Sequence, residues 1–174
     1  MAIREIVSTP HPVLRKKAHK VTKFDRDLQV LIDDMIETMR EAPGVGLAAN
    51  QVGVAEQVIV VEYGEEEDDQ EGSKQAAKKL YVVVNPQIVE SSPETVMGVE
   101  ACLSVPNYYG EVERHTQVVV KGLNRRGKPL RVKAEGWLAR IFQHEIDHLE
   151  GILFTDRATR IWQPKEDESL PADV

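Results

Sequence analysis

The segment His144-Glu145-Ile146-Asp147-His148 constrains the fold of this chain more than any other stretch. It lies in a run from about Trp137 to Leu149 whose apolar residues recur at helical spacing, and Gly151 is well placed to end that helix. Residues four apart on a helix project from nearly the same face, so the two imidazoles can converge on one ion with Glu145 beside them. The pattern predicts a metal site with a general base on one helical turn.

The competing interpretation is that these polar side chains lie on a solvated helix face. Apolar neighbours weigh against it, because they make the helix predominantly apolar, and polar groups in a partly buried element need partners. A metal ion would be such a partner. These neighbours are Leu138, Ile141, Phe142 and Leu149.

Two histidines do not complete a catalytic site, which needs a third protein ligand and an open position for water. A metzincin protease would have its third histidine where this chain has Phe154. A thermolysin-like glutamate ligand would have to come from the short polar C-terminal stretch. Upstream, the segment EACLS (100–104) contains the sole cysteine, Cys102, and a thiolate is a strong ligand for iron or zinc. The alternative for a lone cysteine is a small buried apolar side chain.

The rest of the chain predicts a mixture of isolated helices and strands. An amphipathic helix is expected over Asp25–Met39, ended by Pro43 and Gly44. Because strands are grouped between two helices without regular alternation, we expect an α+β fold. The expected strands are Gln57–Tyr63, Leu80–Val84 closed by Asn85-Pro86, a hairpin of Val118–Leu123 and Leu130–Ala134 around 124–127, and a short strand over Gly151–Phe154.

Composition bounds the class of protein. The 174 residues, 41% of them hydrophobic, suit a single globular domain over 1–174. We expect 64–79 to be a mobile charged insertion and 164–174 a polar tail. The net charge of -7 argues against direct nucleic-acid binding. The single cysteine and the lack of a long apolar stretch favour a cytoplasmic protein with no membrane span, with an organellar location open if a targeting segment was removed.

Three segments, in order, resemble the signature motifs of bacterial and organellar peptide deformylases: GVGLAANQ (44–51), EACLS (100–104) and HEIDH (144–148). The similarity extends to the opening PHPVLRKKA and the continuation HLEGILF, so it covers most of the chain. One departure is Ala101, which replaces the glycine usual in the second motif. If that position needs a positive φ or a close backbone approach to substrate, a methyl group there would alter binding or rate.

The resemblance implies antiparallel β-sheets packed around a central metal-binding HExxH helix, with an N-terminal amphipathic helix. It implies a metal-dependent hydrolase that removes the N-formyl group from the formylmethionine of newly made proteins and releases formate. Cys102, His144 and His148 would bind one divalent ion, most often Fe²⁺ in the family, although the same ligands accommodate Zn²⁺, Ni²⁺ or Co²⁺. Glu145 would be the catalytic acid and base.

The same resemblance assigns supporting roles. The Gln51 side-chain amide and the Leu103 backbone N–H would stabilise the negative charge that develops on the substrate oxygen, against the alternative that Gln51 is a surface residue. Glu100 and Asp147 are candidates to orient the ligand histidines, with Arg114 a partner for Asp147. The alternative for these charges is a set of generic surface ion pairs.

Substrate binding is expected at the first motif. The loop Gly44, Val45, Gly46 and Leu47 would pair with the extended nascent peptide as an added strand, unless it is a simple tight turn. Candidates for the methionine side-chain pocket, with ordinary core as the alternative, are Val45, Leu138 and Ile141.

The expected partners are N-formylmethionyl nascent peptides. Transient ribosome contact is a further candidate that the short acidic tail does nothing to favour. Two competing functions stay open. One is an HExxH protease, disfavoured by Phe154 and by the absence of a histidine after His148. The other is a non-catalytic protein of deformylase type that keeps the metal for structure or serves as a binding module, an interpretation supported only by Ala101.

Overall fold

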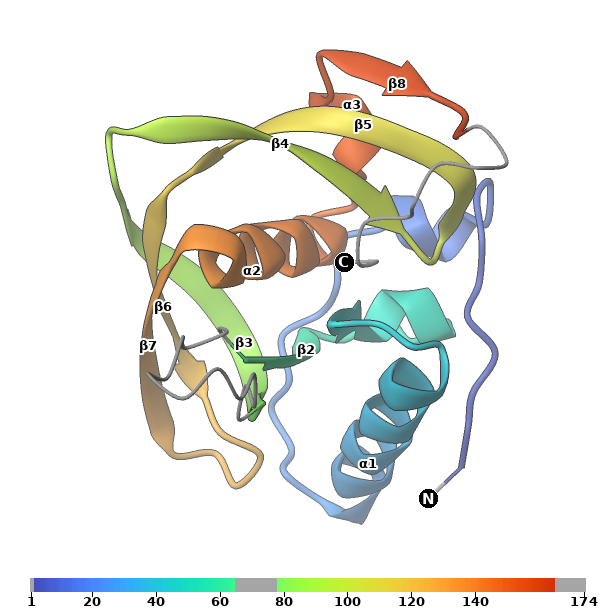
Figure 1. Cartoon of the computed structure of the whole chain (residues 1–174). Helices are drawn as coiled ribbons and strands as arrows, with labels where there is room; N and C mark the ends of the chain where they lie inside the picture. The colour runs from blue at the N-terminus through green and yellow to red at the C-terminus, as the bar shows by residue number, and fades with distance from the viewer. Residues whose placement is uncertain (1, 65–77, 165–174) are drawn as a thin grey trace, which may run out of the picture.

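The computed structural model describes residues 2–64 and 78–164. Most of the insertion predicted at 64–79, and the tail beyond residue 164, lie outside the described residues. Two antiparallel sheets are formed, one in the order β1-β2-β3-β6-β7 and one in the order β4-β5-β8 (Figure 1). The strands are β1 (Gly46–Ala48), β2 (Val58–Tyr63), β3 (Lys79–Ser91), β4 (Thr95–Cys102), β5 (Val105–His115), β6 (Gln117–Leu123), β7 (Pro129–Glu135) and β8 (Arg160–Trp162).

Helix α2 (Gly136–Leu149) lies between the two sheets (Figure 1). It contacts β1, β2, β3, β6 and β7 of the larger sheet and β5 of the smaller one. Its start follows directly on β7, and its end is marked by Gly151, whose φ of 76° suits a residue without a side chain. The predicted α+β fold with antiparallel sheets is confirmed, and α2 contains the segment HEIDH (144–148).

Helix α1 (Arg26–Glu41) covers the other face of the larger sheet. The Asp25 carboxylate caps it by accepting a hydrogen bond from the Leu28 N–H at 3.1 Å. Strand β2 is apolar on both faces because Val58 and Val60 pack on the α1 side, whereas Ile59 packs on the α2 side. The sheet that carries β1 is therefore held between two helices.

The β6–β7 hairpin is confirmed, but the predicted end of β3 at Asn85-Pro86 is wrong. Strand β3 continues to Ser91 through a register shift between Val84 and Gln87. Asn85 occupies the left-handed region at φ 53°, and its side chain bonds both backbone groups of Val21. The irregularity accommodates Pro86, which has no N–H to donate to the ladder.

The sequence pattern did not predict β1, β4, β5 or β8. Strands β4 and β5 place Gly98, Glu100 and Arg114 on their inner face beside Val112, so the usual alternation of apolar inner and polar outer residues is interrupted there. The strand predicted over Gly151–Phe154 is wrong: Phe154 instead begins the short helix α3 (Phe154–Arg157), capped by the Asp156 carboxylate that accepts from the Leu153 N–H. Among the described residues, no helix is long and apolar enough to cross a bilayer.

Candidate metal centre

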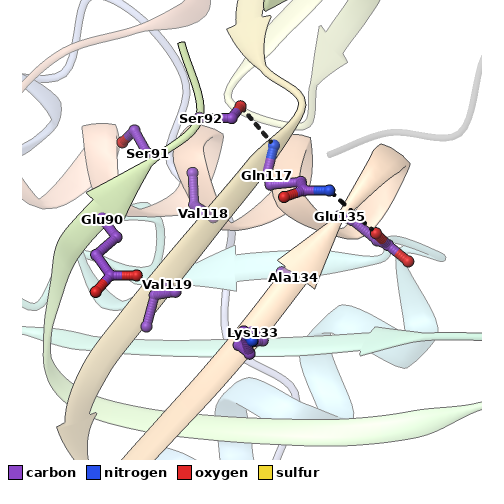
Figure 2. A pocket seen from close by; sticks show the side chains of 9 residues that line it. All are labelled: Glu90, Ser91, Ser92, Gln117, Val118, Val119, Lys133, Ala134 and Glu135. Atoms are coloured by element: carbon purple, nitrogen blue, oxygen red, sulfur yellow. Dashed lines mark hydrogen bonds between the residues drawn. The ribbon is translucent and has the colours of Figure 1, made fainter. Parts of the chain in front are cut away.

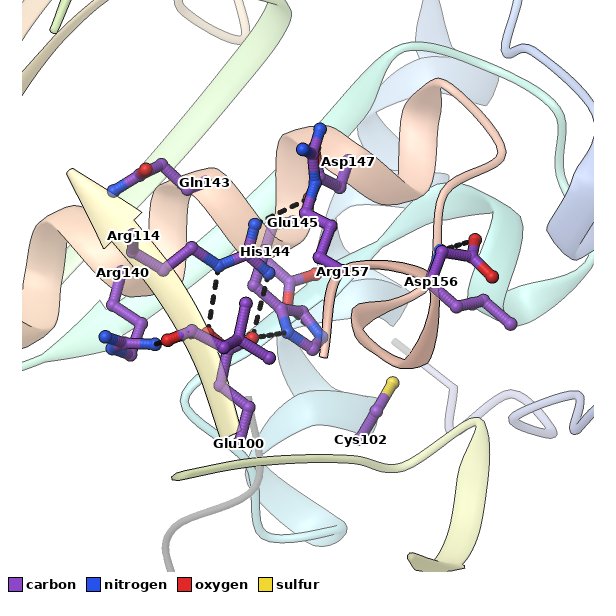
Figure 3. Close-up of polar contacts among 12 residues, drawn as sticks. Glu100, Cys102, Arg114, Arg140, Gln143, His144, Glu145, Asp147, Asp156 and Arg157 are labelled. Carbon is purple, nitrogen blue, oxygen red and sulfur yellow. Dashed lines mark hydrogen bonds and ion pairs between the residues drawn. The ribbon is translucent and has the colours of Figure 1, made fainter. Parts of the chain in front are cut away.

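Three side chains predicted as metal ligands converge in the interior between α2 and the end of β4. Figure 3 shows two of them, Cys102 and His144. Cys102, His144 and His148 are all buried, and one ligand atom from each lies within 4.8 Å of the others. The Cys102 Sγ is 3.3 Å from the His148 Nε2, which is 3.2 Å from the His144 Nε2. The structure therefore brings together two helix residues and a strand residue that are distant in sequence.

Glu145 is fully buried beside these three groups. Neither of its carboxylate oxygens has a hydrogen-bond partner among the described residues, and its Oε1 lies 4.0 Å from the His144 Nε2. Burial raises the pKa of Glu145 well above its ordinary value, and the negative charge of Glu100 adds to the shift. A carboxyl group of raised pKa is suited to exchange protons near neutral pH.

The donor set fits a divalent metal ion. A thiolate and two imidazoles are ligands that zinc and iron both accept. Burial, with smaller contributions from the neighbouring His144 and Arg114, lowers the pKa of His148 well below its ordinary value, which keeps that imidazole neutral and able to donate a lone pair. An unpartnered buried carboxylate beside three converging donors is costly unless a cation lies among them.

Glu100 contacts the side chain of His144. Its Oε1 lies 2.9 Å from the His144 Nδ1, and because a carboxylate only accepts, Nδ1 must carry the proton, leaving the lone pair on Nε2. Burial opposes the charge of Glu100, but hydrogen bonds from Arg114 and His144 hold the pKa of its carboxyl well below the ordinary value. Glu100 has no exposed surface and Arg114 is nearly as buried, which excludes a generic surface pair.

Asp147 does not contact a ligand histidine. It accepts from the Arg114 Nη1 at 2.6 Å and from Arg157 at 2.7 and 3.0 Å. The pairing predicted between Asp147 and Arg114 is present. Arg114 also donates to both oxygens of Glu100, at 2.9 Å each. Asp147 is therefore linked to His144 only through Arg114 and Glu100.

Gln51 is fully buried, so the surface interpretation of this residue is wrong. Its Oε1 accepts from the Ala48 N–H at 3.0 Å, which turns its Nε2 toward the Ser104 Oγ at 3.1 Å and the Cys102 Sγ at 3.6 Å. Leu103 and Ser104 form the turn between the paired Cys102 and Val105, outside the ladder. The first two motifs thus meet at the thiol.

The glycines of the first motif give close approach. A Cβ at Gly46 would lie 2.9 Å from the Glu145 Cγ, and one at Gly44 would lie 3.1 Å from the Leu103 Cδ1. Gly46 and Leu47 belong to β1, whereas Gly44 and Val45 lie directly before the strand. Ala101 does not need a left-handed backbone, since Asn85 and Asn107 are the non-glycine residues of positive φ in the described chain.

The candidates for the side-chain pocket separate into two groups. Val45 and Leu138 are half-buried at the edge of the core cluster around α2. Ile141 belongs to that cluster and Leu47 to the one beneath α1, and neither has exposed surface. Of the three residues predicted for the methionine side-chain pocket, Val45 and Leu138 therefore keep some exposed surface and Ile141 keeps none.

Several residues of this region were missed by sequence reasoning. Arg140 donates to Glu100, and Phe154, seen in the sequence only as a missing histidine, stacks on His144 with ring centroids 6.0 Å apart. Asn50 donates to the His148 carbonyl and ties the first motif to the end of α2. For Phe154, its position six residues after His148 was the one signal in the sequence that it lies near the site. The contacts of Arg140 and Asn50 join segments that are far apart in the sequence, so no local pattern indicates them.

A groove of about 610 Å³ lies away from this centre, along the end of β3 and strands β6 and β7 (Figure 2). Within it the Gln117 N–H donates to the Ser92 Oγ at 3.1 Å and the Gln117 amide to Glu135 at 3.4 Å. None of its lining residues is a predicted site residue. The lining consists of Glu90, Ser91, Ser92, Gln117, Val118, Val119, Lys133, Ala134 and Glu135.

Comparison with known proteins agrees with the geometry. The polypeptide deformylase family model matches residues 3–163. A peptide deformylase of Symbiobacterium thermophilum is 53% identical over 167 residues, covering 96% of this chain and 72% of that protein. One of Halothermothrix orenii is 49% identical, covering 92% and 97%. The crystal structure of the peptide deformylase from Thermotoga maritima superposes with a TM-score of 0.80 at 41% identity, covering 92% of this chain and all of that one. This chain therefore belongs to the peptide deformylase family, the enzymes that remove N-formyl groups from nascent peptides.

Proposed function

We propose that this chain deformylates N-formylmethionyl peptides with one divalent metal ion bound by Cys102, His144 and His148, and with Glu145 as general acid and base. The observation that carries the proposal is the convergence of the three ligand atoms within 4.8 Å beside a buried carboxylate that has no partner among the described residues. A divalent ion in such a site supplies a water of lowered pKa and polarises a carbonyl oxygen.

Glu145 transfers the protons of the reaction. With its raised pKa, it accepts a proton from the attacking water and later delivers a proton to the nitrogen of the leaving amine. The water oxygen bonds to the formyl carbon, the carbon–nitrogen bond breaks, and the products are formate and a free amino terminus. Gly46 leaves room for the Glu145 side chain, because a side chain at position 46 would overlap it.

Charge on the formyl oxygen would be stabilised by two hydrogen-bond donors, the Gln51 Nε2 and the Leu103 N–H. Gln51 is held for this role by the Ala48 N–H, which fixes its Oε1 and leaves the amino group facing the thiol. Leu103 lies in the turn after Cys102, next to the ligand sulfur in sequence. Two donors of this kind typically contribute about 10² to 10³ each in rate.

Strand β1 supports peptide binding by strand addition. It is an edge strand of the five-stranded sheet, paired on one side with β2. We propose that the peptide backbone pairs along the segment from Gly44 to Leu47, and that Val45 and Leu138 contact the methionine side chain. Leu47, which is buried, would contribute its backbone alone.

The physiological metal is proposed to be Fe²⁺, since sulfur and imidazole ligands suit it and the family most often uses it. Zn²⁺, Ni²⁺ and Co²⁺ would bind to the same ligands.

We further propose that 1–174 acts as a single catalytic domain in the cytoplasm, in line with its bacterial relatives. Contact with the ribosome would be transient and is tested by cosedimentation with translating ribosomes.

The test is anaerobic purification followed by measurement of metal content and of formate released from a formyl-Met peptide, with a protein-digestion assay in parallel. Formate at a rate proportional to bound metal, without internal cleavage, is expected. Internal cleavage of proteins would favour the HExxH protease. Metal bound with no product in either assay would favour the non-catalytic alternative and refute the proposal.

A further inference from the structure

Arg140, one helical turn before His144, has its guanidinium buried with only 3% of the side chain exposed (Figure 3). Its Nη1 donates to the Glu100 Oε2 at 2.6 Å and to the Val112 carbonyl at 2.9 Å, and its Nη2 donates to the Val96 carbonyl at 2.9 Å. Burying a guanidinium is costly unless it is paired and its donors are satisfied. Arg140 meets both conditions by joining α2 to β4 and β5.

Gly98 makes the space for this guanidinium. A Cβ at Gly98 would lie 2.6 Å from the Arg140 Cζ and 2.7 Å from its Nη2, closer than real Cβ contacts allow. Gly98 pairs with Val112 in the β4–β5 ladder, so the side chain of Arg140 crosses that ladder where one strand has no side chain. Gly98 and Arg140 therefore form a matched pair.

The carboxylate of Glu100 is fully occupied. Arg114 from β5 bonds both of its oxygens, the His144 Nδ1 bonds Oε1, and Arg140 bonds Oε2. Arg114 alone neutralises the charge, but it comes from a neighbouring strand. Arg140 and His144 lie four residues apart on one face of α2 and hold the two oxygens separately. The carboxylate is thus held by the two-point contact from Arg114 on one strand and by the same helix that presents the imidazole.

We propose that Arg140 is a positioning residue of the metal centre: with Gly98 it fixes the Glu100 carboxylate so that the His144 Nδ1–H stays bonded and the His144 Nε2 faces the ligand cluster. The inference rests on the proposed metal site. Without Arg140, the Glu100 carboxylate would keep its two bonds from Arg114 and could move together with that guanidinium. Its bond to His144 would then be the only direct contact between Glu100 and α2. Loss of such an orienting partner typically weakens metal affinity about 10- to 100-fold.

The test compares zinc affinity, by competition with a chelator, in the wild type, Arg140→Met and Gly98→Ala. Gly98→Ala keeps the arginine but displaces its guanidinium, so both variants are expected to bind zinc about 10- to 100-fold more weakly. The ¹H NMR signal of the His144 Nδ1 proton should broaden or shift upfield in both. Arg125→Met is the matched control, because Arg125 also pairs with a carboxylate, that of Asp33 at 2.7 Å, and lies outside the metal centre. Its zinc affinity should equal that of the wild type.

Unchanged zinc affinity together with an unchanged His144 signal in Arg140→Met would overturn the proposal. If Arg140→Met does not fold, Gly98→Ala decides by the same two measurements. Because zinc affinity does not depend on turnover, a zinc-loaded wild type that released no formate would refute the proposed reaction and leave this comparison valid.

Discussion

Replacing Arg114 with methionine removes the cation that joins the two carboxylates behind the metal centre. Three charge-assisted hydrogen bonds are lost, two to Glu100 and one to Asp147. Breaking a buried ion pair costs about 3 to 5 kcal/mol when a charge is left uncompensated. Here Glu100 keeps Arg140 and Asp147 keeps Arg157, so the lower end applies. We expect the free energy of unfolding to fall by about 3 kcal/mol.

The measurement is urea denaturation of metal-free protein, since a metal bound only by the folded state would add to apparent stability. A loss of this size corresponds to a Tm lowered by roughly 6 to 12 °C in a chain of this length. Arg125→Met serves as the control, because its pair with Asp33 is 32% and 39% exposed and should contribute at most about 1 kcal/mol. If Arg114→Met cost no more than that control, the buried network would not stabilise the fold as argued.

Three further predictions concern single side chains. Glu145→Ala should keep metal but release formate about 10² to 10⁴ times more slowly, and a wild-type rate would refute its role as acid and base. Cys102→Ser should retain less metal after dialysis because a poorly ionised hydroxyl replaces a soft thiolate, and unchanged metal content would remove Cys102 from the site. Asp34→Asn tests acid stability: burial opposes the shift, but hydrogen bonds from Ala2 and Arg4 hold the pKa of Asp34 below its ordinary 3.8. Its ion pair with Arg4 therefore stabilises the fold fully above that ordinary value and is lost as the pH falls from there through the lowered pKa of the folded state. Wild type and variant should differ by about 1 kcal/mol at pH 7 and converge as the pH falls below the lowered pKa in urea titrations.

Local patterns predicted the elements whose stability comes from one apolar face. The helix over Asp25–Met39 appears as α1, and the β6–β7 hairpin forms around its Gly127 turn, where φ is 83°. These elements could be predicted because periodicity and turn chemistry are local properties of the chain. Strands β4 and β5 could not, since their inner face mixes Gly98 and Val112 with Glu100 and Arg114, and these two charges are buried only because they pair with one another.

For the metal centre, the i, i+4 spacing of His144 and His148 is enough to place two nitrogens and Glu145 together on one helix. The sequence also shows that the chain has a thiol, Cys102, but it does not show how far that thiol lies from the helix. Only the packing of β4 against α2 brings the Cys102 Sγ to 3.3 Å from the His148 Nε2.

By itself, the sequence determined the ligand types, the helix that presents two of them and the family to which the motifs belong. The tertiary structure decided which side chains are buried and what they contact: Glu100 is buried with its two arginines, Gln51 is turned toward the thiol, and Ile141 belongs to the core cluster around α2. The physical reason is that ion pairing and desolvation depend on contacts between segments far apart in the chain. Such contacts leave no period or spacing in the sequence from which to infer them.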